Sequence, residues 1–259
     1  QLALAGSCRS LGVEALISRL GAKLPDAGHT LLLYTLLNSQ PSFLRSLQDD
    51  TTHLQKVVIG ILHGMYDEST QGSVEHHCLL SVCVLILSQE ANLRPILVET
   101  KGVLPWYKER NFHHASSAVG LADAIILCVL RALMHVVMRL KDPYLASNYF
   151  AVLLNISPFI NDIHSYTAER LVGVTHKLAK RLSSSHARAQ SGDVGSPLME
   201  ETLRVLFRSI WLCVKCTTRC INLQYVLARD FLDIEVSFSD PYISQLCDGA
   251  DGGPRAEEL

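Results

Sequence analysis

The sequence predicts an all-α protein, specifically an α-solenoid of stacked helices of the armadillo or HEAT type. Three observations support this fold class. The chain has 259 residues with 48% hydrophobic content, enough to bury a sizeable core. Apolar residues recur at i, i+3, i+4 and i+7 along most of the chain, without the sustained alternation of a β-strand. Proline and glycine interrupt this pattern at short intervals, as expected between stacked helices.

The predicted helices follow one another with short connections, so we expect a single helical region over residues 1–247. Two stretches differ in composition. Residues 183–197 are rich in Ser, Ala and Gly and are predicted as a flexible loop, and residues 248–259 as a disordered tail. The cores of the predicted helices are HTLLLYTLLNSQ (29–40), HLQKVVIGILHGMY (53–66), VEHHCLLSVCVLIL (74–87), LASNYFAVLLNIS (145–157), AERLVGVTHKLAKRL (168–182) and ETLRVLFRSIWLCVKC (201–216).

A similar corner ends three of the apolar segments. The segments are LLNSQPSFLRSL (36–47), LILSQEANLRPI (85–96) and LLNISPFI (153–160). Asn and Ser compete with the helical hydrogen bonds at such a corner, and the apolar residues that follow restart packing on a new axis. This is the unit of an α-solenoid, and in the third copy we expect Leu154 to lie on the buried stripe. Chance similarity among Leu-rich helix ends is the alternative.

One apolar segment, residues 118–140, is long enough to cross a bilayer. Asp123 and Arg131 near its middle oppose insertion, and His135 adds to that cost. At 100° per residue these three side chains and Arg139 share one arc of about 160°, which leaves the opposite arc apolar. The segment is therefore predicted to be a buried amphipathic helix instead of a membrane span.

Charge and cysteine content narrow the class of protein further. The formal net charge is −2, from 23 basic and 25 acidic residues, which does not favour nucleic acid as a partner. Eight cysteines, mostly within apolar runs, indicate reduced thiols in a protein that faces the cytosol. The chain starts at Gln1 without a visible signal peptide, and we expect it to be a fragment of a longer protein.

The segment from 149 to 182 resembles the armadillo unit, in which an apolar helix, an Asn-Ile-Ser corner, a small helix and a longer amphipathic helix follow one another. More narrowly, residues 29–243 resemble the dymeclin family of Golgi-associated helical proteins. Members are longer, and many begin with a Met-Gly pair suited to myristoylation, which is absent here. The motifs that carry this resemblance, in order, are TLLLYTLLNS (30–39), His76-His77, LPWYKER (104–110), KDPYLASNYFAVLLNIS (141–157), HSYTAERLVGVTHKLAKR (164–181) and NLQYVLARDFLD (222–233).

The resemblance implies a non-catalytic scaffold or adaptor in Golgi organisation and vesicle trafficking. It implies protein partners from the Golgi and trafficking machinery, and a cytoplasmic, Golgi-associated peripheral membrane location reached through regions absent from this chain. The sequence lacks the GxSxG, Walker, HExxH and Rossmann motifs, and we predict no catalytic, cofactor-binding or metal-binding residues. The alternatives are an unrelated armadillo or HEAT adaptor for cargo peptides and, less favoured, an all-α metal-dependent enzyme.

Three cysteines form the strongest candidate for a metal site. On one helix, Cys213, Cys216 and Cys220 would lie at i, i+3 and i+7, within an arc of about 60°. A fourth ligand would have to come from elsewhere in the sequence. Apolar thiols on the buried stripe of a helix are the favoured interpretation. The available fourth ligands are His176, His186 and Cys247.

The other candidates are histidine pairs, a basic stretch and an aromatic pair. His76-His77 and His113-His114 are adjacent residues that point about 100° apart on a helix, so a helix start or surface position is favoured over chelation. Trp106-Tyr107 is an exposed anchor or, preferably, a corner packed under a helix. A basic stretch fits an acidic partner or lipid head groups, or the solvated end of a helix with cations near its negative pole. It consists of Lys177, Lys180, Arg181 and Arg188.

Overall fold

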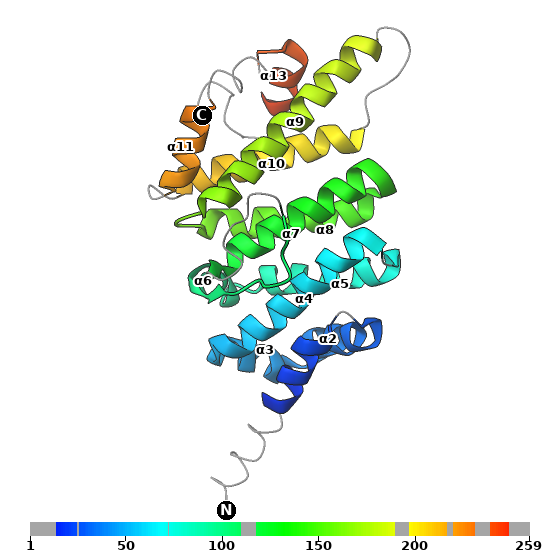
Figure 1. The fold of residues 1–259 in the computed structure, drawn as a ribbon, viewed down its shortest axis with the longest axis vertical. Coiled ribbons are helices and arrows are strands. Elements are labelled where there is room, and N and C mark those ends of the chain that lie inside the picture. The colour runs from blue at the N-terminus through cyan, green and yellow to red at the C-terminus, as the bar shows by residue number, and fades with distance from the viewer. Residues whose placement is uncertain are drawn as a thin grey trace, which may run out of the picture. The chain divides into compact units, whose positions relative to one another are not determined.

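The computed structural model confirms the all-α class. It describes residues 14–24, 26–71, 73–109, 118–189, 197–216, 220–230 and 239–248, and helices make up nearly all of the regular structure in these ranges. Figure 1 shows the helices in chain order. They are a helix over 14–23, α2 (Ala27–Ser39), α3 (Pro41–Asp49), α4 (Thr51–Gln71), α5 (Val74–Gln89), α6 (Leu93–Glu99), α7 (Leu121–His135), α8 (Pro143–Ile156), α9 (Ser165–Ala189), α10 (Pro197–Cys216), α11 (Ile221–Arg229) and α13 (Pro241–Asp248).

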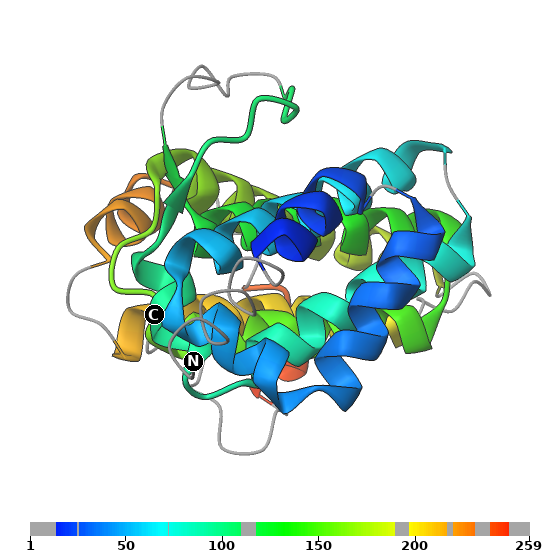
Figure 2. The ribbon, with the colours of Figure 1, turned by 90° about the horizontal axis from the view of Figure 1, so that it is seen from below.

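The chain divides into two compact units, Gln1–Cys128 and Val129–Leu259. In the first unit, α2 packs against α3 and α5, α4 packs against α3 and α5, and α6 packs against α3 and α5. Strands β1 (Lys101–Gly102) and β2 (Val119–Gly120) pair antiparallel, as the two arrows in Figure 2 show. The described residues of the first unit thus form neighbouring helices and one two-residue strand pair.

Two glycines let helices of the first unit come into backbone contact. A Cβ atom on Gly60 of α4 would lie 2.3 Å from the carbonyl oxygen of Gly21, in the helix over 14–23. A Cβ on Gly21 would in turn lie 2.8 Å from the carbonyl oxygen of Lys56. Any side chain would force these two helices apart, so the glycines set the close packing of this helix on α4.

In the second unit, α10 packs against α8 and α9, and α11 packs against α9. Helix α13 contacts both α9 and α10. Figure 1 shows α11, in orange, near the N-terminal end of the long helix α9 and α13, in red, nearer its C-terminal end. Helix α9 is therefore the element on which the C-terminal helices of this unit assemble.

The predicted corners are confirmed as helix–turn–helix junctions. Gln40 separates α2 from α3, and the axes of α5 and α6 differ by 102° across their short break. Helix α8 ends at Ile156 and continues into the 3₁₀ turn η2 (Ser157–Phe159), where the Ser157 hydroxyl donates to the Leu153 carbonyl oxygen at 2.7 Å. A helix, a short helix and a long helix thus recur in order, as α2–α3–α4, α5–α6–α7 and α8–η2–α9.

The burial of two adjacent leucines in α8 corrects one prediction. Leu154, expected on the buried stripe, is half-buried, whereas its neighbour Leu153 is 2% exposed. Periodicity placed the stripe on the correct helix but one residue away from its buried centre, which Leu153 and Val152 occupy.

The apolar segment predicted to be buried forms α7 and the π-helical turn η1 (Val136–Leu140). Residues Leu121–Leu140 have a mean hydropathy of 2.1, enough in length and composition for a membrane span, and 78% of the tested window is buried inside the protein. Helices α5 and α6, taken together across their bend, are also long and apolar enough for a span. Asp123 is 8% exposed and so does not lie on a solvated arc, while Arg131 and His135 are half-buried and Arg139 is exposed.

The predicted segment boundaries change in one place. Helix α9 continues to Ala189, so residues 183–189 of the predicted loop are helical, and α10 begins at Pro197. Residues 190–196 and the predicted tail beyond Asp248 lie outside the described residues. Because the boundary between the two compact units falls inside α7, the expectation of one continuous region stays a prediction.

Candidate functional site

The exposed face of α9 carries the basic residues predicted from the sequence. Lys177, Lys180 and Arg181 are all exposed, and no ion pair joins them to another described residue. At 100° per residue their side chains lie within an arc of about 100°. The side chain of Arg188 lies outside the described residues. We call Lys177, Lys180 and Arg181 the basic face of α9.

The observed length of α9 removes the simplest structural explanation for these charges. The helix ends at Ala189, so Arg181 lies about two turns and Lys177 about three turns before its last residue. The helix macrodipole favours cations only within the last turn. Like charges at i, i+3 and i, i+4 repel each other by a few tenths of a kcal/mol per pair. The basic face therefore lowers the stability of the helix instead of capping it.

The N-terminal half of α9 is tied to α11 by polar contacts. Arg229 of α11 donates to Glu169 of α9 over 2.8 Å and also pairs with Asp230. The hydrogen bonds that Arg229 donates to Asp230 and Glu169 raise the pKa of Arg229, and the bond from Arg229 lowers the pKa of Asp230. Asn222 donates to the Ile163 carbonyl oxygen at 2.8 Å. Glu169, the acidic residue on the exposed side of α9, is thus neutralised by Arg229.

The C-terminal half of α9 is covered by α13, which the sequence did not reveal. The Ser183 hydroxyl donates to Asp240, and this bond lowers the pKa of Asp240. Tyr242 stacks on His186 with ring centroids 4.0 Å apart and donates its hydroxyl to Glu200 of α10 at 2.6 Å. Burial, and then the bond to Glu200, raise the pKa of Tyr242 to about 12. The open part of α9 therefore lies between its contacts with α11 and α13.

A repeated tripeptide in the sequence marks the start of α13. The tripeptide Asp-Pro-Tyr occurs at the start of α8, with Tyr144, and again at the start of α13, with Tyr242. The Asp142 carboxylate caps α8 through the backbone N–H of Tyr144 at 2.9 Å, and Asp240 accepts from the backbone N–H of Tyr242 at 2.9 Å. The motif predicts a helix start in both places, but Tyr144 is 85% exposed, whereas Tyr242 packs on His186. Only nonlocal packing separates the two.

The three candidate cysteines do not share one helix. Helix α10 ends at Cys216, and Cys220 lies beyond it, immediately before α11. Cys213 is 1% exposed, and the buried Cys220 thiol donates to the Ile160 carbonyl oxygen at 3.3 Å. The side chains of Cys216 and Cys247 lie outside the described residues. Within the part of the chain that the structure describes, no three His, Cys, Asp or Glu side chains are grouped as metal ligands would be.

The histidine pair at the start of α5 is buried, which corrects the surface alternative. Ser73 caps α5 by accepting from the backbone N–H of His76, so the predicted helix start is confirmed. His76 and His77 are 6% and 4% exposed. The second pair, at 113 and 114, lies outside the described residues.

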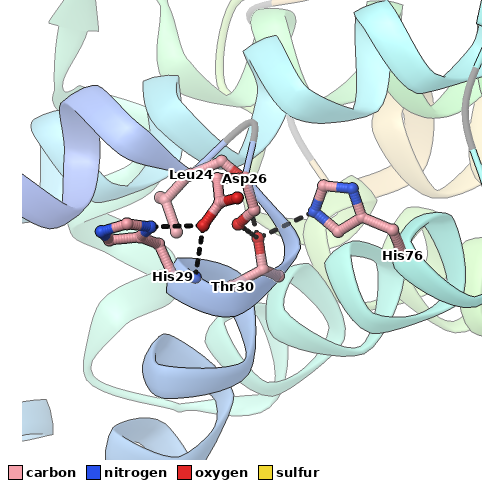
Figure 3. Close-up of polar contacts among 5 residues, drawn as sticks. All are labelled: Leu24, Asp26, His29, Thr30 and His76. Carbon is pink, nitrogen blue, oxygen red and sulfur yellow. Dashed lines mark hydrogen bonds and ion pairs between the residues drawn. The ribbon is translucent and has the colours of Figure 1, made fainter.

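His76 takes part in a polar network that joins α5 to the start of α2 (Figure 3). The Thr30 hydroxyl donates to the Leu24 carbonyl oxygen at 2.7 Å and lies 2.9 Å from Nε2 of His76. Since Thr30 has one hydroxyl proton, Nε2 of His76 must be the donor in the second bond. Asp26 caps α2, and its hydrogen bond from His29 Nδ1, at 2.5 Å, lowers the pKa of Asp26. The network ties structural elements together, because Asp26 caps the start of α2 and Thr30 links the Leu24 carbonyl oxygen to His76 of α5.

The aromatic pair after Pro105 packs on α4. Trp106 stacks on His63 with ring centroids 5.1 Å apart, and Tyr66 lies 5.3 Å from Tyr107. Tyr107 is 2% exposed, and the Tyr66 hydroxyl accepts from the backbone N–H of Lys108 at 3.2 Å. The preferred prediction of a packed corner is confirmed.

The chain resembles known proteins over most of its length. The family described as "Dymeclin: Dyggve-Melchior-Clausen syndrome protein" matches residues 6–229. Dymeclin of Drosophila melanogaster is 32% identical over 157 residues, which is 59% of this chain and 21% of that protein. Dymeclin of Rattus norvegicus is 26% identical over 206 residues, which is 74% of this chain and 29% of that protein. No solved structure matches significantly. This chain therefore spans less than a third of either relative.

Proposed function

This chain belongs to the dymeclin family, and we propose that it forms part of a non-catalytic helical scaffold that acts in Golgi organisation and vesicle trafficking through protein contacts. The dymeclin family is not a known enzyme family. The observation that carries the proposal is the basic face of α9. Its three cations are exposed, unpaired among the described residues and unfavourable for the helix itself, which fits a surface kept for a partner.

The arrangement within each unit supports a solenoid scaffold as part of this proposal. In the first unit, α2 packs against α5 and α3 against α6, so corresponding helices of successive groups are neighbours. In the second unit, α8 packs against α10. Packing of corresponding helices is the rule by which solenoids grow and by which they create extended binding surfaces. We therefore propose an armadillo-like solenoid that presents α9 as part of its surface.

The location that we propose is the cytoplasmic face of the Golgi, with peripheral membrane association in the complete protein. The sequence's balance of 23 basic and 25 acidic residues argues against attachment to anionic lipid by net charge alone. A scaffold held there by protein contacts needs a specific surface, and the basic face provides charges that favour encounter with an acidic partner.

The proposal is tested by the location of the full-length protein in cells. The variant carries Lys177→Glu and Arg181→Glu, and its matched control is Arg208→Glu, which reverses an exposed cation on α10. We expect the double variant to lose most of its Golgi association and the control to retain it, because charges at a contact act on encounter and specificity. Thermal melting of the purified chains checks folding. Golgi association that is unchanged in a folded double variant contradicts the proposal.

A further inference from the structure

We propose that the exposed face of α9 binds an acidic amphipathic helix of a partner protein, which crosses α9 at Gly173. The inference rests on the proposed function and adds the chemistry and the geometry of the partner. It draws on the surroundings of Gly173, the basic face next to it and the two contacts that bound the open part of the helix.

Gly173 lies in the middle of α9, where glycine costs about 1 kcal/mol relative to alanine. A Cβ atom at this position would meet nothing within 4 Å, so packing among the described residues does not explain the glycine. By contrast, a Cβ on Gly60 would meet the Gly21 carbonyl oxygen, and a Cβ on Gly21 the Lys56 carbonyl oxygen, at a helix contact in the first unit. A helix glycine with open space above it provides the same close approach for a helix from outside.

The basic face places its charges beside this point of approach. Lys177 follows Gly173 by about one turn and Arg181 by about two turns on the same side of α9. Acidic side chains on a crossing helix would offset the repulsion among the three cations and form charged pairs at the rim of the contact. Charge complementarity therefore specifies a partner helix rich in Asp and Glu.

The size of the open face fits one helix. It is bounded by the Glu169–Arg229 ion pair on one side and by the contact of Ser183 with Asp240 on the other. The residues between these contacts span about 20 Å along the axis, and a helix with its side chains is about 10 Å wide. A lipid surface is the less favoured partner, because basic clusters that bind anionic membranes contain about four to eight cations, and the basic face has three among the described side chains.

The test measures binding of a defined peptide to the full chain by fluorescence anisotropy at low salt. The probe is a labelled helical peptide of Ala, Leu and Glu with its glutamates on one face, and a second peptide carries Gln in place of Glu. Vesicles of phosphatidylserine and phosphatidylcholine are titrated in parallel. The variants are Gly173→Leu, the double variant Lys177→Glu with Arg181→Glu, and the control Arg208→Glu.

We expect the Glu peptide to bind and the Gln peptide to bind about tenfold more weakly. Gly173→Leu should weaken binding of the Glu peptide by about tenfold because it removes the close approach of the helices. The double variant should weaken this binding by about tenfold because it removes the charge complementarity. Arg208→Glu should leave binding unchanged. Because leucine favours a helix more than glycine does, Gly173→Leu should keep or raise the melting temperature, which separates loss of binding from loss of fold.

Three results overturn the inference: equal binding of the Glu and Gln peptides, full binding by Gly173→Leu, or charge-dependent binding of the vesicles without binding of the Glu peptide. The outcome of the peptide-binding test and the outcome of the Golgi-association test can be told apart. If peptide binding depends on Gly173 and the basic face while Golgi association does not, the binding site stands and the proposed function is wrong. If Golgi association alone depends on these residues, the helical partner is wrong and the proposed function stands.

Discussion

Leu153 and Leu154 are chemically identical neighbours in α8, yet they differ in burial. Leu153 is 2% exposed, and Leu154 is half-buried. The stability cost of removing a side chain follows the apolar area and the cavity that it leaves, so the two positions should respond differently to the same substitution.

We expect Leu153→Ala to lower the free energy of unfolding by about 2 to 5 kcal/mol, as truncation of a buried leucine does. Leu154→Ala is the matched control and should cost about half as much or less, because part of its surface already meets water. Chemical denaturation of both variants measures the difference. Equal costs would mean that the burial assigned to the end of α8 is wrong.

Thr30 provides a second contrast between chemically identical residues. Its hydroxyl is buried and bonds both Leu24 and His76, whereas the exposed Thr35 hydroxyl donates to the Leu31 carbonyl oxygen of its own helix. Thr30→Val leaves the buried Nε2 of His76 without this acceptor, and we expect a loss of about 1 to 3 kcal/mol. Thr35→Val should change stability by less than about 0.5 kcal/mol. Thermal or urea unfolding separates the two; a neutral Thr30→Val would show that the network does not support α2 and α5.

At the scale of elements, α13 contacts α9 and α10 through its buried Ile243 and Leu246 and through several polar side chains. Ser183 bonds Asp240, and Arg204 donates to the Leu246 carbonyl oxygen at 3.3 Å, beside the Tyr242 contacts with His186 and Glu200. The polar part of this contact depends on the charge state of Asp240, whereas the burial of Ile243 and Leu246 does not.

This dependence predicts the pH at which α13 separates. The pKa of Asp240 in the folded protein lies below its ordinary value of 3.8, so its contribution to docking is present above that pH and is lost as the pH falls through the lowered pKa. We expect the ring signals of Tyr242 in NMR spectra to shift toward those of a solvated tyrosine in this acid range. In Asp240→Asn the shift should be absent or occur already at neutral pH. Identical acid transitions in both proteins would assign the release to other carboxylates.

At the scale of the whole molecule, the proposed function resides in the surface of the helices and not in the cysteines. Both thiols are buried, Cys213 within α10 and Cys220 after its end. The Cys220 thiol already donates to the Ile160 carbonyl oxygen. The full-length protein with Cys213→Ala, Cys216→Ala and Cys220→Ala should therefore keep its Golgi association whenever it stays folded. Localisation in cells with a parallel thermal melt tests this. Loss of Golgi association in a folded triple variant would contradict this prediction and favour a metal site at the cysteines.

The amino-acid sequence by itself determined the all-α class, the order of the helices and the corners between them. These features depend on local causes: the 3.6-residue period of apolar side chains, capping residues such as Asp142, and polar residues such as Ser157 that end a helix. The same local signals placed Tyr107 in a packed corner, because Trp-Tyr after proline needs a surface to cover it.

Tertiary structure alone decided which of two similar residues is buried and where the open surface lies. Within the continuous helix α9, the Ser184 hydroxyl donates to the Lys180 carbonyl oxygen at 2.8 Å, and Ser183 donates to Asp240, a residue just before α13 and far away in the sequence. The burial of His76 depends in the same way on Thr30, across two helices. Such contacts join segments that are distant along the chain, so local periodicity does not predict them. For this reason, neither the length of α9 nor the absence of described ion-pair partners for its basic face followed from the sequence.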